Sequence, residues 1–458
     1  MMDVSKAITF RFDSDRFTLT PKNWVFLFFL ALGFRILYLA WLGANLYDPN
    51  GDEFQYINVT SSWLTQGLDW DSFFKLTNGE RLPGYFLFIA ILGLDIKRIV
   101  IFQMIMDSLT CTIFSYTFAH YLKNLRLTLL FSVLLITNPT MIIYSAMILN
   151  ETLFLFCLSL ATFFLCQFHR TQANWACFYC SLFLASLLFI KVGGLVVSII
   201  FAVSIIIITR ATALRKFSLL IMLCIPSCLI GMYQVKSIEK LSSSQALTTQ
   251  AGTHLLKFVL IPYKMANETI SREKALAEID AKLMNHPLFN RTDNEVLRSQ
   301  IRSSLALEEF KKIPLTLILR ESLISVAIMF SLPAAVDDPK FKKIRQLSFS
   351  RDTSGSIFNR ILQIITGEDK RIVMIGFLFG IGMVFWWLGV LIGVPIALRR
   401  CSFVVFLSFI LVGCFALISV PLMTPKYRHP AEPFISLFLA WGFYHILNFL
   451  DSTKLDGQ

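Results

Sequence analysis

Charged residues are scarce in this chain of 458 residues: they make up 16% of it, whereas hydrophobic residues make up 55%. Soluble globular domains carry about 25% charged residues, so this scarcity excludes an ordinary soluble enzyme. The mean hydropathy is +0.64, and Phe alone accounts for 44 residues. The composition therefore predicts an all-α polytopic membrane protein.

Acidic residues are the scarcer of the two charge types, with 30 Asp and Glu against 42 Lys and Arg, and the formal net charge is +12. In a soluble domain this excess would suggest a nucleic-acid partner. In a membrane protein, Lys and Arg collect in cytoplasmic loops and beside anionic head groups. We therefore interpret the basic excess as topology and predict that the protein binds no nucleic acid.

The sequence also lacks the cysteine pattern of a disulfide or zinc framework. The nine cysteines lie nearly all in apolar runs or at their ends, whereas such frameworks place them in loops with ligand spacing and polar neighbours. Cys177 and Cys180 form a C-x-x-C pattern, but it falls inside an apolar run. We expect these two thiols to serve packing.

Long apolar runs are what the chain does have, and they divide it into three parts. The first run, 23–42, follows Lys22 and precedes an acidic loop, which predicts a cytoplasmic N-terminus and an outer position for that loop. The expected parts are an N-terminal transmembrane module (1–233) with the first outer loop at 43–98, an outer-face segment with interfacial helices (234–370), and C-terminal transmembrane helices (371–458). Within this plan we expect about ten spans.

The run 313–332 is long enough to span, but Arg320 and Glu321 lie in its middle, where lipid exposure would cost several kcal/mol. Treating it as interfacial keeps Arg399 and Arg400 in the cytoplasm, brings 426–429 to the outer face and leaves both termini cytoplasmic. We predict that arrangement. Residues 271–307 have helical spacing and mixed charge, which predicts small helices lying over the outer face like a lid, without a compact core of their own.

Polar residues that border the apolar runs gather on the predicted outer face. They are Asp52, Glu53, Glu80, Arg81, Glu151, Lys191, Lys426, Tyr427, Arg428 and His429. Ionisable groups beside hydrocarbon are expensive and usually face a cavity or one another. Acids and bases converging on one face predict a site for an anionic, membrane-borne substrate; the alternative is a set of interhelix ion pairs that fix the packing.

Several of these residues stand in short motifs. The motifs are Asp52-Glu53 with Tyr56, Arg81-Leu82-Pro83-Gly84-Tyr85, Asn138-Pro139 followed by Tyr144-Ser145 and Asn150-Glu151, and Lys426-Tyr427-Arg428-His429-Pro430 with Pro433. In order and common sidedness they resemble the bacterial members of the protein O-mannosyltransferase and aminoarabinose-transferase superfamily, which have the GT-C fold. The Tyr-Arg order at 427–428 departs from the Arg-Tyr-x-x-Pro element of that superfamily. The resemblance implies a bundle of about 10–13 transmembrane helices.

The same resemblance implies an activity: inverting transfer of a sugar from a polyprenyl-phosphate donor, the co-substrate, to an acceptor hydroxyl of a cell-envelope glycan, lipid or protein. The reaction would take place at the outer face of a bacterial inner membrane, in a monomer. Asp52 would be the general base with Glu53 as second choice, and sequence physics leaves the two nearly tied. Arg81, Lys191, Lys426 and Arg428 would bind the donor phosphate. Glu80, Glu151, Tyr56 and Tyr427 would position the acceptor or orient the cations, and the acids could instead bind a divalent metal; no other cofactor is expected.

Two rival functions stay open at this point. A lipid-linked glycan flippase or transporter would show paired repeats and interrupted helices near the midplane, and the sequence has no convincing repeat. A polysaccharide polymerase is harder to exclude, because it also works on lipid-borne glycans but accepts a whole repeat unit where the glycosyltransferase takes a single sugar.

Overall fold

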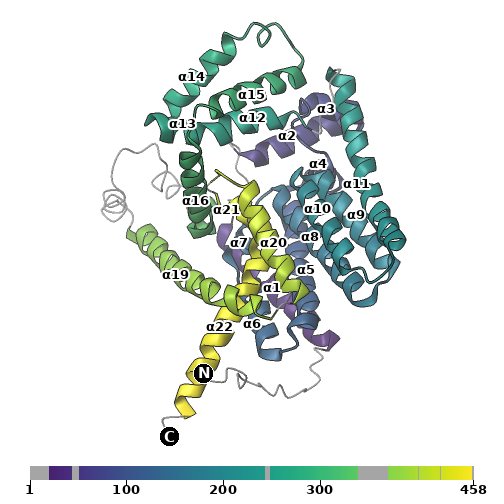
Figure 1. Ribbon diagram of the computed structural model, residues 1–458, viewed down its shortest axis with the longest axis vertical. Helices are drawn as coiled ribbons and strands as arrows, with labels where there is room; N and C mark the ends of the chain where they lie inside the picture. Colours follow the sequence, from purple (N-terminus) through teal and green to yellow (C-terminus); the bar gives the residue numbers. More distant parts are fainter. Residues whose placement is uncertain are drawn as a thin grey trace, which may run out of the picture.

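A computed structural model describes residues 20–43, 51–242, 248–338, 370–400, 402–422 and 424–455. These ranges are almost entirely helical and contain no strand (Figure 1). Six helical stretches in them are long and apolar enough to cross a membrane. They are α1 (Pro21–Leu42), α5 (Ile96–Leu122), α8 (Asn150–Thr171), most of α11 (Ala213–Ser242), the Gly380–Leu398 part of α19 (Lys370–Leu398), and Pro425–Asp451, which takes in α21 (Pro425–Arg428), η5 (His429–Ala431) and most of α22 (Glu432–Leu455). The prediction of an all-α polytopic membrane protein is confirmed for the described residues.

Two pairs of helices add bent candidate spans. The first pair, α6 (Leu125–Ile136) and α7 (Pro139–Ser145), is bent by 43°, and the second, α15 (Glu295–Phe310) and α16 (Leu315–Ser331), by 111°. Counting each pair as one span gives up to eight. A total of ten requires further crossings by the shorter apolar helices α9 (Asn174–Ile190), α10 (Gly193–Ile208) and α20 (Phe403–Ile418), and it stays a prediction, as does the interfacial position of 313–332.

The bend between α6 and α7 has a local cause. Pro139 occupies the first turn of α7, and the Asn138 side chain accepts hydrogen bonds from the backbone N–H of Thr140 at 2.9 Å and of Met141 at 3.3 Å. Asn is a favoured N-cap and Pro a favoured first residue of a helix. The chain therefore starts a new helix at Asn138-Pro139.

Short helices after α1 form a second core beside the spans. They are α2 (Asp52–Thr65), α3 (Trp70–Leu76) and α4 (Gly84–Ile91), and they bury Trp63, Phe73 and Phe86 together. Gly84 permits a close approach, because a Cβ there would lie 2.8 Å from the carbonyl oxygen of Phe189 at the end of α9.

A third core lies in a unit that we call the α12–α15 unit. It consists of α12 (Gln250–Thr253), η2 (His254–Leu260), α13 (Ile261–Glu268), α14 (Arg272–Met284) and α15, and it occupies the end of the molecule next to α2 and α3 (Figure 1). Leu260, Ile279, Leu283 and Ile301 are buried in it. The expectation that this segment lacks a core is therefore wrong, because its helices bury their apolar faces against one another. The expected boundary at 233 also falls inside α11, which continues to Ser242.

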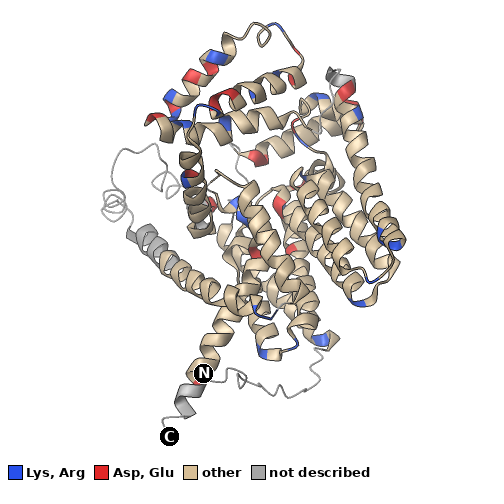
Figure 2. Cartoon of the chain, in the orientation of Figure 1, with Lys and Arg blue, Asp and Glu red and all other residues tan. Residues whose placement is uncertain are grey.

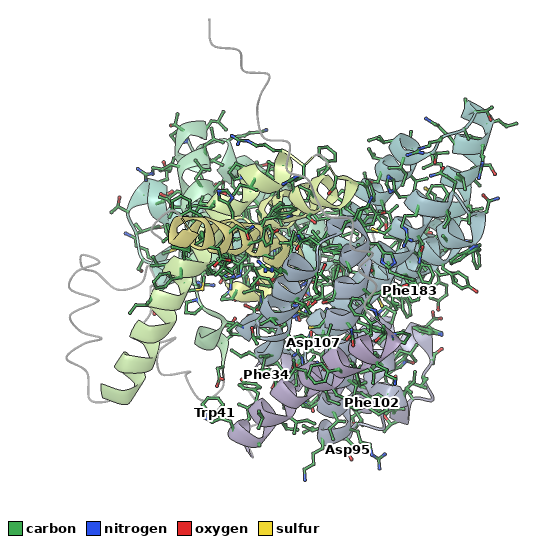
Figure 3. All side chains as sticks on the ribbon, turned by 90° about the horizontal axis from the view of Figure 1, so that it is seen from below. Phe34, Trp41, Asp95, Phe102, Asp107 and Phe183 are labelled. Carbon is green, nitrogen blue, oxygen red and sulfur yellow. The ribbon has the colours of Figure 1, made fainter. Side chains whose placement is uncertain are left out.

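Within the bundle, charged residues are few (Figure 2), and two of them form a buried pair. Arg35 of α1 donates through Nε to Asp107 of α5 at 2.7 Å, and through Nη1 to the carbonyl oxygens of Ala31 and Ile136 at 2.9 and 3.0 Å. Phe34, Trp41 and Phe102 on the same two helices are exposed on the outside, whereas Asp107 is buried (Figure 3). Asp107 therefore has a structural partner inside the bundle.

The C-x-x-C pattern is also structural. Cys177 and Cys180 are buried, and their thiols donate to the carbonyl oxygens of Leu219 at 3.8 Å and Ala161 at 3.5 Å. In the described part of the chain the cysteines are free thiols. The prediction of a packing role is confirmed.

We expect Asp107→Leu to destabilise the fold by about 3–5 kcal/mol, because it leaves the Arg35 guanidinium uncompensated inside the bundle. The double variant Arg35→Met, Asp107→Leu should recover most of that loss, because it removes both charges and keeps the volume filled. Thermal unfolding in detergent measures both effects. Arg98→Ala is the matched control: it breaks the exposed Arg98–Asp95 pair and should cost under about 1 kcal/mol. A double variant no more stable than Asp107→Leu would contradict this account.

Candidate functional site

Five charged side chains from five separate segments meet beside α2, and we call them the charge cluster. Arg81 contacts Asp52 at 3.0 Å, and Asp52 contacts Lys426 at 2.7 Å. Lys426 lies 3.8 Å from Glu151, which accepts from Lys191 at 3.2 Å. The result is a continuous chain of alternating charges, Arg81–Asp52–Lys426–Glu151–Lys191, that joins residues up to 374 positions apart.

Helix ends position the two acids of the charge cluster. Asp52 is the first residue of α2, and Glu151 lies in the first turn of α8. The N-terminus of a helix carries a partial positive charge that favours a carboxylate. Both acids therefore gain from their position before any cation is counted.

The two lysines occupy short connections that the local sequence fixes. Lys191 ends α9 and directly precedes the turn into α10, where Gly194 passes so close to α9 that a Cβ would lie 2.5 Å from the backbone of Leu187. Lys426 lies in α21, whose N-cap, Thr424, accepts a hydrogen bond from the Lys426 N–H at 3.4 Å. These turns hold both ammonium groups toward Glu151.

The surroundings of the charge cluster are half-buried and aromatic. The Glu151 side chain is 1% exposed, those of Lys426 and Arg81 are 20% and 21% exposed, and that of Asp52 is 38% exposed. Arg81 also donates to Gln55 at 2.8 Å and lies over the Tyr56 ring at 5.7 Å, while Lys191 lies over the Tyr427 ring at 5.5 Å. With three cations against two carboxylates, the cluster has one positive charge in excess, which suits an anionic ligand.

These contacts control the protonation of Asp52. Burial alone would raise its pKa, but the charges of Lys426 and Arg81 and their hydrogen bonds outweigh burial and lower the pKa to about 2. Burial likewise raises the pKa of the Tyr56 hydroxyl, so that Tyr56 is neutral beneath Arg81. Asp52 is therefore a carboxylate at any ordinary pH, and it becomes more basic only when one of its cations is drawn away.

Glu53, which the sequence leaves nearly tied with Asp52, points elsewhere. Its side chain is buried and accepts the backbone N–H of Ile148 at 3.0 Å, which fixes α2 against the segment between α7 and α8. The structure therefore separates the two adjacent acids: Asp52 belongs to the charge cluster, and Glu53 supports the backbone.

Arg428 also differs from its predicted place among the phosphate ligands. Its Nε donates to Glu432 at 2.6 Å, and its Nη1 donates to the carbonyl oxygens of Met329, Phe330 and Leu332 at the end of α16. The last carbonyl groups of a helix lack hydrogen-bond donors within the helix, and the buried Arg428 guanidinium provides those donors for α16. We therefore describe Arg428 as a clamp between α16 and α22 and remove it from the candidate phosphate ligands.

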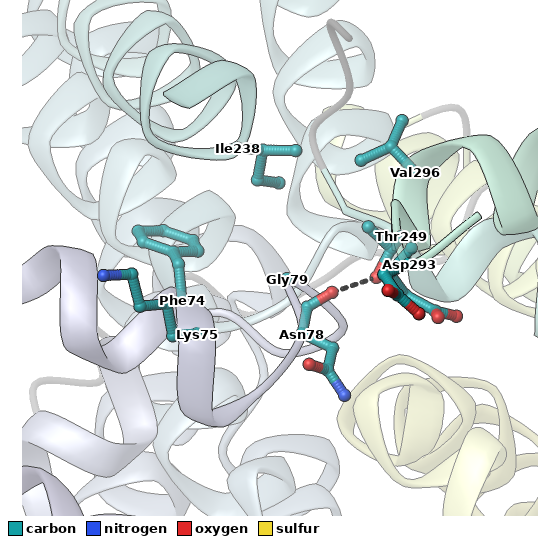
Figure 4. A pocket seen from close by; sticks show the side chains of 9 residues that line it. Phe74, Lys75, Asn78, Gly79, Ile238, Thr249, Asp293 and Val296 are labelled. Atoms are coloured by element: carbon teal, nitrogen blue, oxygen red, sulfur yellow. Dashed lines mark hydrogen bonds between the residues drawn. The ribbon is translucent and has the colours of Figure 1, made fainter. Parts of the chain in front are cut away.

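Glu80 lies next to Arg81 but faces the α12–α15 unit. Burial raises the pKa of Glu80 above its ordinary value. The charge of Arg81 opposes this shift, and the charge of Glu295 of α15 adds to it. The loop of Glu80 is held by the same unit, because Thr249 donates through Oγ1 to the carbonyl oxygen of Asn78 at 2.7 Å and through its N–H to that of Gly79 at 3.0 Å. A cavity of about 190 Å³ lies at this junction (Figure 4).

His429 is the predicted outer-face residue that is most completely covered. The side chain is 0% exposed, its ring packs edge-on against Tyr144 with a centroid distance of 5.2 Å, and neither ring nitrogen has a hydrogen-bond partner. Oε2 of Glu151 is likewise buried without a partner. Tyr144 in turn donates to Asp337, which also accepts from Thr424 at 3.1 Å.

Sequence reasoning misses several of these polar contacts. It does not find Asp337 of η3 (Ala334–Asp337), the pair of Tyr38 and Asp338 at 2.7 Å, or the Asn138 amide that donates to Glu432 at 2.8 Å. The one available signal is that each polar residue borders an apolar run, which does not name its partner. Within the described ranges, no group of three or more His, Cys, Asp or Glu side chains could hold a metal ion.

The lowered pKa of Asp52 predicts a pH-dependent difference between wild type and Asp52→Asn. The folded-state pKa of about 2 lies below the ordinary 3.8, so the stabilisation is complete above about pH 5, is reduced by about half at pH 3 and disappears near pH 2. Because the ion pairs of Asp52 are partly exposed, the melting temperatures of wild type and Asp52→Asn at neutral pH should differ by only about 1–2 °C. Melting curves in detergent from pH 7 to pH 3 measure it, and a gap that is constant over this range would contradict the ion pairs.

No family model matches this chain, and no curated protein sequence matches it.

Proposed function

We propose that the protein is an integral membrane glycosyltransferase that moves a sugar from a polyprenyl-phosphate donor to an acceptor hydroxyl, with the charge cluster as its active site. The observation that carries the proposal is the excess of cations over acids in a half-buried cluster beside membrane-length helices. A lipid phosphate that reaches this level of the membrane would supply the missing negative charge. We further propose that the chain acts as a monomer with a GT-C-type bundle, in a bacterial inner membrane, with the cluster facing outward.

Arg81, Lys191 and Lys426 would hold the donor phosphate. As the bond between the anomeric carbon and the phosphate oxygen breaks, that oxygen keeps the electron pair, and preorganised cations stabilise the charge that develops. The planar guanidinium of Arg81 suits a bidentate phosphate contact, and the two lysines act as compact charges. Tyr56 and Tyr427 support these cations through their ring faces.

Asp52 would take the proton. The acceptor oxygen forms the new bond to the anomeric carbon, and its proton moves to a carboxylate oxygen of Asp52. In the ligand-free protein Lys426 and Arg81 keep Asp52 weakly basic. A bound phosphate would draw these cations toward itself and raise the pKa of Asp52, so the base would gain strength only when the donor is present.

The α12–α15 unit would form the lid and contribute to acceptor recognition. It is bound to the loop that carries Arg81 through Thr248 and Thr249, and α16, which follows it, is clamped by Arg428. Closure over both substrates would exclude water and limit hydrolysis of the donor. Glu80, at the junction with the unit, and Glu151, beside both lysines, would orient the acceptor and the cations.

One observation favours the rival class, a flippase or transporter of lipid-linked glycans. Transporters bind substrate where helices are interrupted, and the α6–α7 and α15–α16 pairs are bent by 43° and 111°. Reconstituted vesicles distinguish the two classes. A transferase forms a new glycosidic bond in detergent solution, whereas a flippase needs an intact bilayer and leaves its substrate unchanged.

Purified protein incubated with polyprenyl-phosphate sugars and candidate acceptors tests the transferase directly. We expect Asp52→Asn to lower the transfer rate by about 10²–10⁴-fold, the usual contribution of a positioned general base. Arg81→Gln should lower it as well, through loss of the phosphate contact.

Glu53→Gln is the matched control, because it changes the adjacent acid in the same helical turn, and Gln can still accept from the Ile148 N–H. Its transfer rate should stay near that of the wild type. Full activity of Asp52→Asn, or equal losses in both variants, would overturn the assignment of Asp52.

A further inference from the structure

A groove of about 420 Å³ runs between α6 and α22, and no residue of the charge cluster lines it. The two helices pack side by side at the lower end of the bundle in Figure 1. Its walls are mostly apolar, formed by Leu129, Leu130 and Val133 of α6 and by Leu447 of α22, and Tyr444 and Asn448 of α22 complete them. In a helix pair that faces hydrocarbon, such a groove suits an acyl chain.

One end of the groove is charged. Arg126 lies in the first turn of α6 and Asp451 in the last turns of α22, and both line the groove. Their side chains are 78% and 68% exposed, and Nη1 of Arg126 lies 4.0 Å from Oδ2 of Asp451. An exposed ion pair at this distance contributes little to the stability of the fold. Each side chain can therefore leave the other and bind a ligand instead.

The position of this charged end matches the head-group level of a membrane. Arg126 is the second residue of α6, and Asp451 is the last residue of the candidate span 425–451, so in a membrane that these helices cross both charges would lie near the head groups. Val133 lies two helical turns deeper, about 10 Å along the axis. The two helices are fixed to each other at the mouth, because the Asn124 amide donates to the Tyr444 hydroxyl at 3.0 Å.

We propose that this groove binds a phospholipid whose head group carries both a phosphate and a primary ammonium, as in phosphatidylethanolamine. The phosphate would contact Arg126, the ammonium would donate to Asp451, and one acyl chain would lie along the leucines. An anionic head group without an ammonium would meet the repulsion of Asp451. A choline head group lacks the N–H donors that the carboxylate accepts.

Native mass spectrometry of the full-length protein in detergent, with equal amounts of phosphatidylethanolamine, phosphatidylglycerol and phosphatidylcholine, tests the proposal. Each head-group contact should be worth about fivefold in affinity, so phosphatidylethanolamine should be retained about fivefold over the other two. Asp451→Asn should abolish this preference and raise the share of phosphatidylglycerol. Arg126→Gln should lower retention of all three, and Val133→Trp, which fills the groove, should do the same.

Lys123→Gln is the control, because it removes a charge from the same basic turn without lining the groove and should leave retention unchanged. Arg126→Gln and Asp451→Asn change exposed side chains, and melting curves verify that they fold as the wild type does. Preferred retention of phosphatidylglycerol by the wild type would overturn the proposal. Equal effects of Lys123→Gln and Arg126→Gln, or retention that no variant alters, would overturn it as well.

Discussion

The pairing of charges in a largely apolar protein is the constraint on which the rest of this structure depends. A charged group at the middle of a bilayer costs several kcal/mol unless it meets an opposite charge or a cavity. Arg35 and Asp107 meet this condition inside the bundle, and Arg428 and Glu432 meet it at the start of α22. The Arg35–Asp107 pair joins α1 to α5, and Arg428 also bonds the carbonyls at the end of α16, so the same requirement that limits charge also holds separate helices against one another.

The charge cluster obeys this constraint incompletely, and that distinguishes it from the structural pairs. Arg35 also bonds two backbone carbonyls, and Arg428 bonds three. The ammonium groups of Lys191 and Lys426, by contrast, contact carboxylates and have partly exposed side chains. A cation that is already saturated by backbone carbonyls contributes to the fold, whereas one that is held only by an exchangeable carboxylate can turn to a ligand. This difference, rather than proximity in the sequence motif, is why Lys426 stays a candidate phosphate ligand while Arg428, two residues later, does not.

The sequence predicts the class of the molecule and includes all five charge-cluster residues among its candidates, because these predictions depend on local composition and on charges that border apolar runs. It does not separate Asp52 from Glu53, since adjacent acids in one helical turn have the same local signal. They differ in distant partners: the Ile148 N–H for Glu53 and Lys426 for Asp52. It also misses the core of the α12–α15 unit. The helices of this unit are amphipathic and carry mixed charges, so the sequence does not show that their apolar faces pack against one another. Partners such as Asp337 for Tyr144 are lost for the same reason: their contacts join distant parts of the chain.

The low pKa of Asp52 argues for a particular order of events in a transferase of this design. If the base were strong before the acceptor binds, it would also activate water, and the water would hydrolyse the donor. Here Lys426 and Arg81 suppress the basicity of Asp52 to a pKa of about 2, and the same two cations are the ones that a phosphate would recruit. In the proposed transferase, donor binding and base activation would be one event, because each step that moves a cation toward the phosphate removes it from the carboxylate. The α12–α15 unit contacts the Arg81 loop through Thr248 and Thr249, so its position can favour or oppose that exchange without touching the reacting atoms.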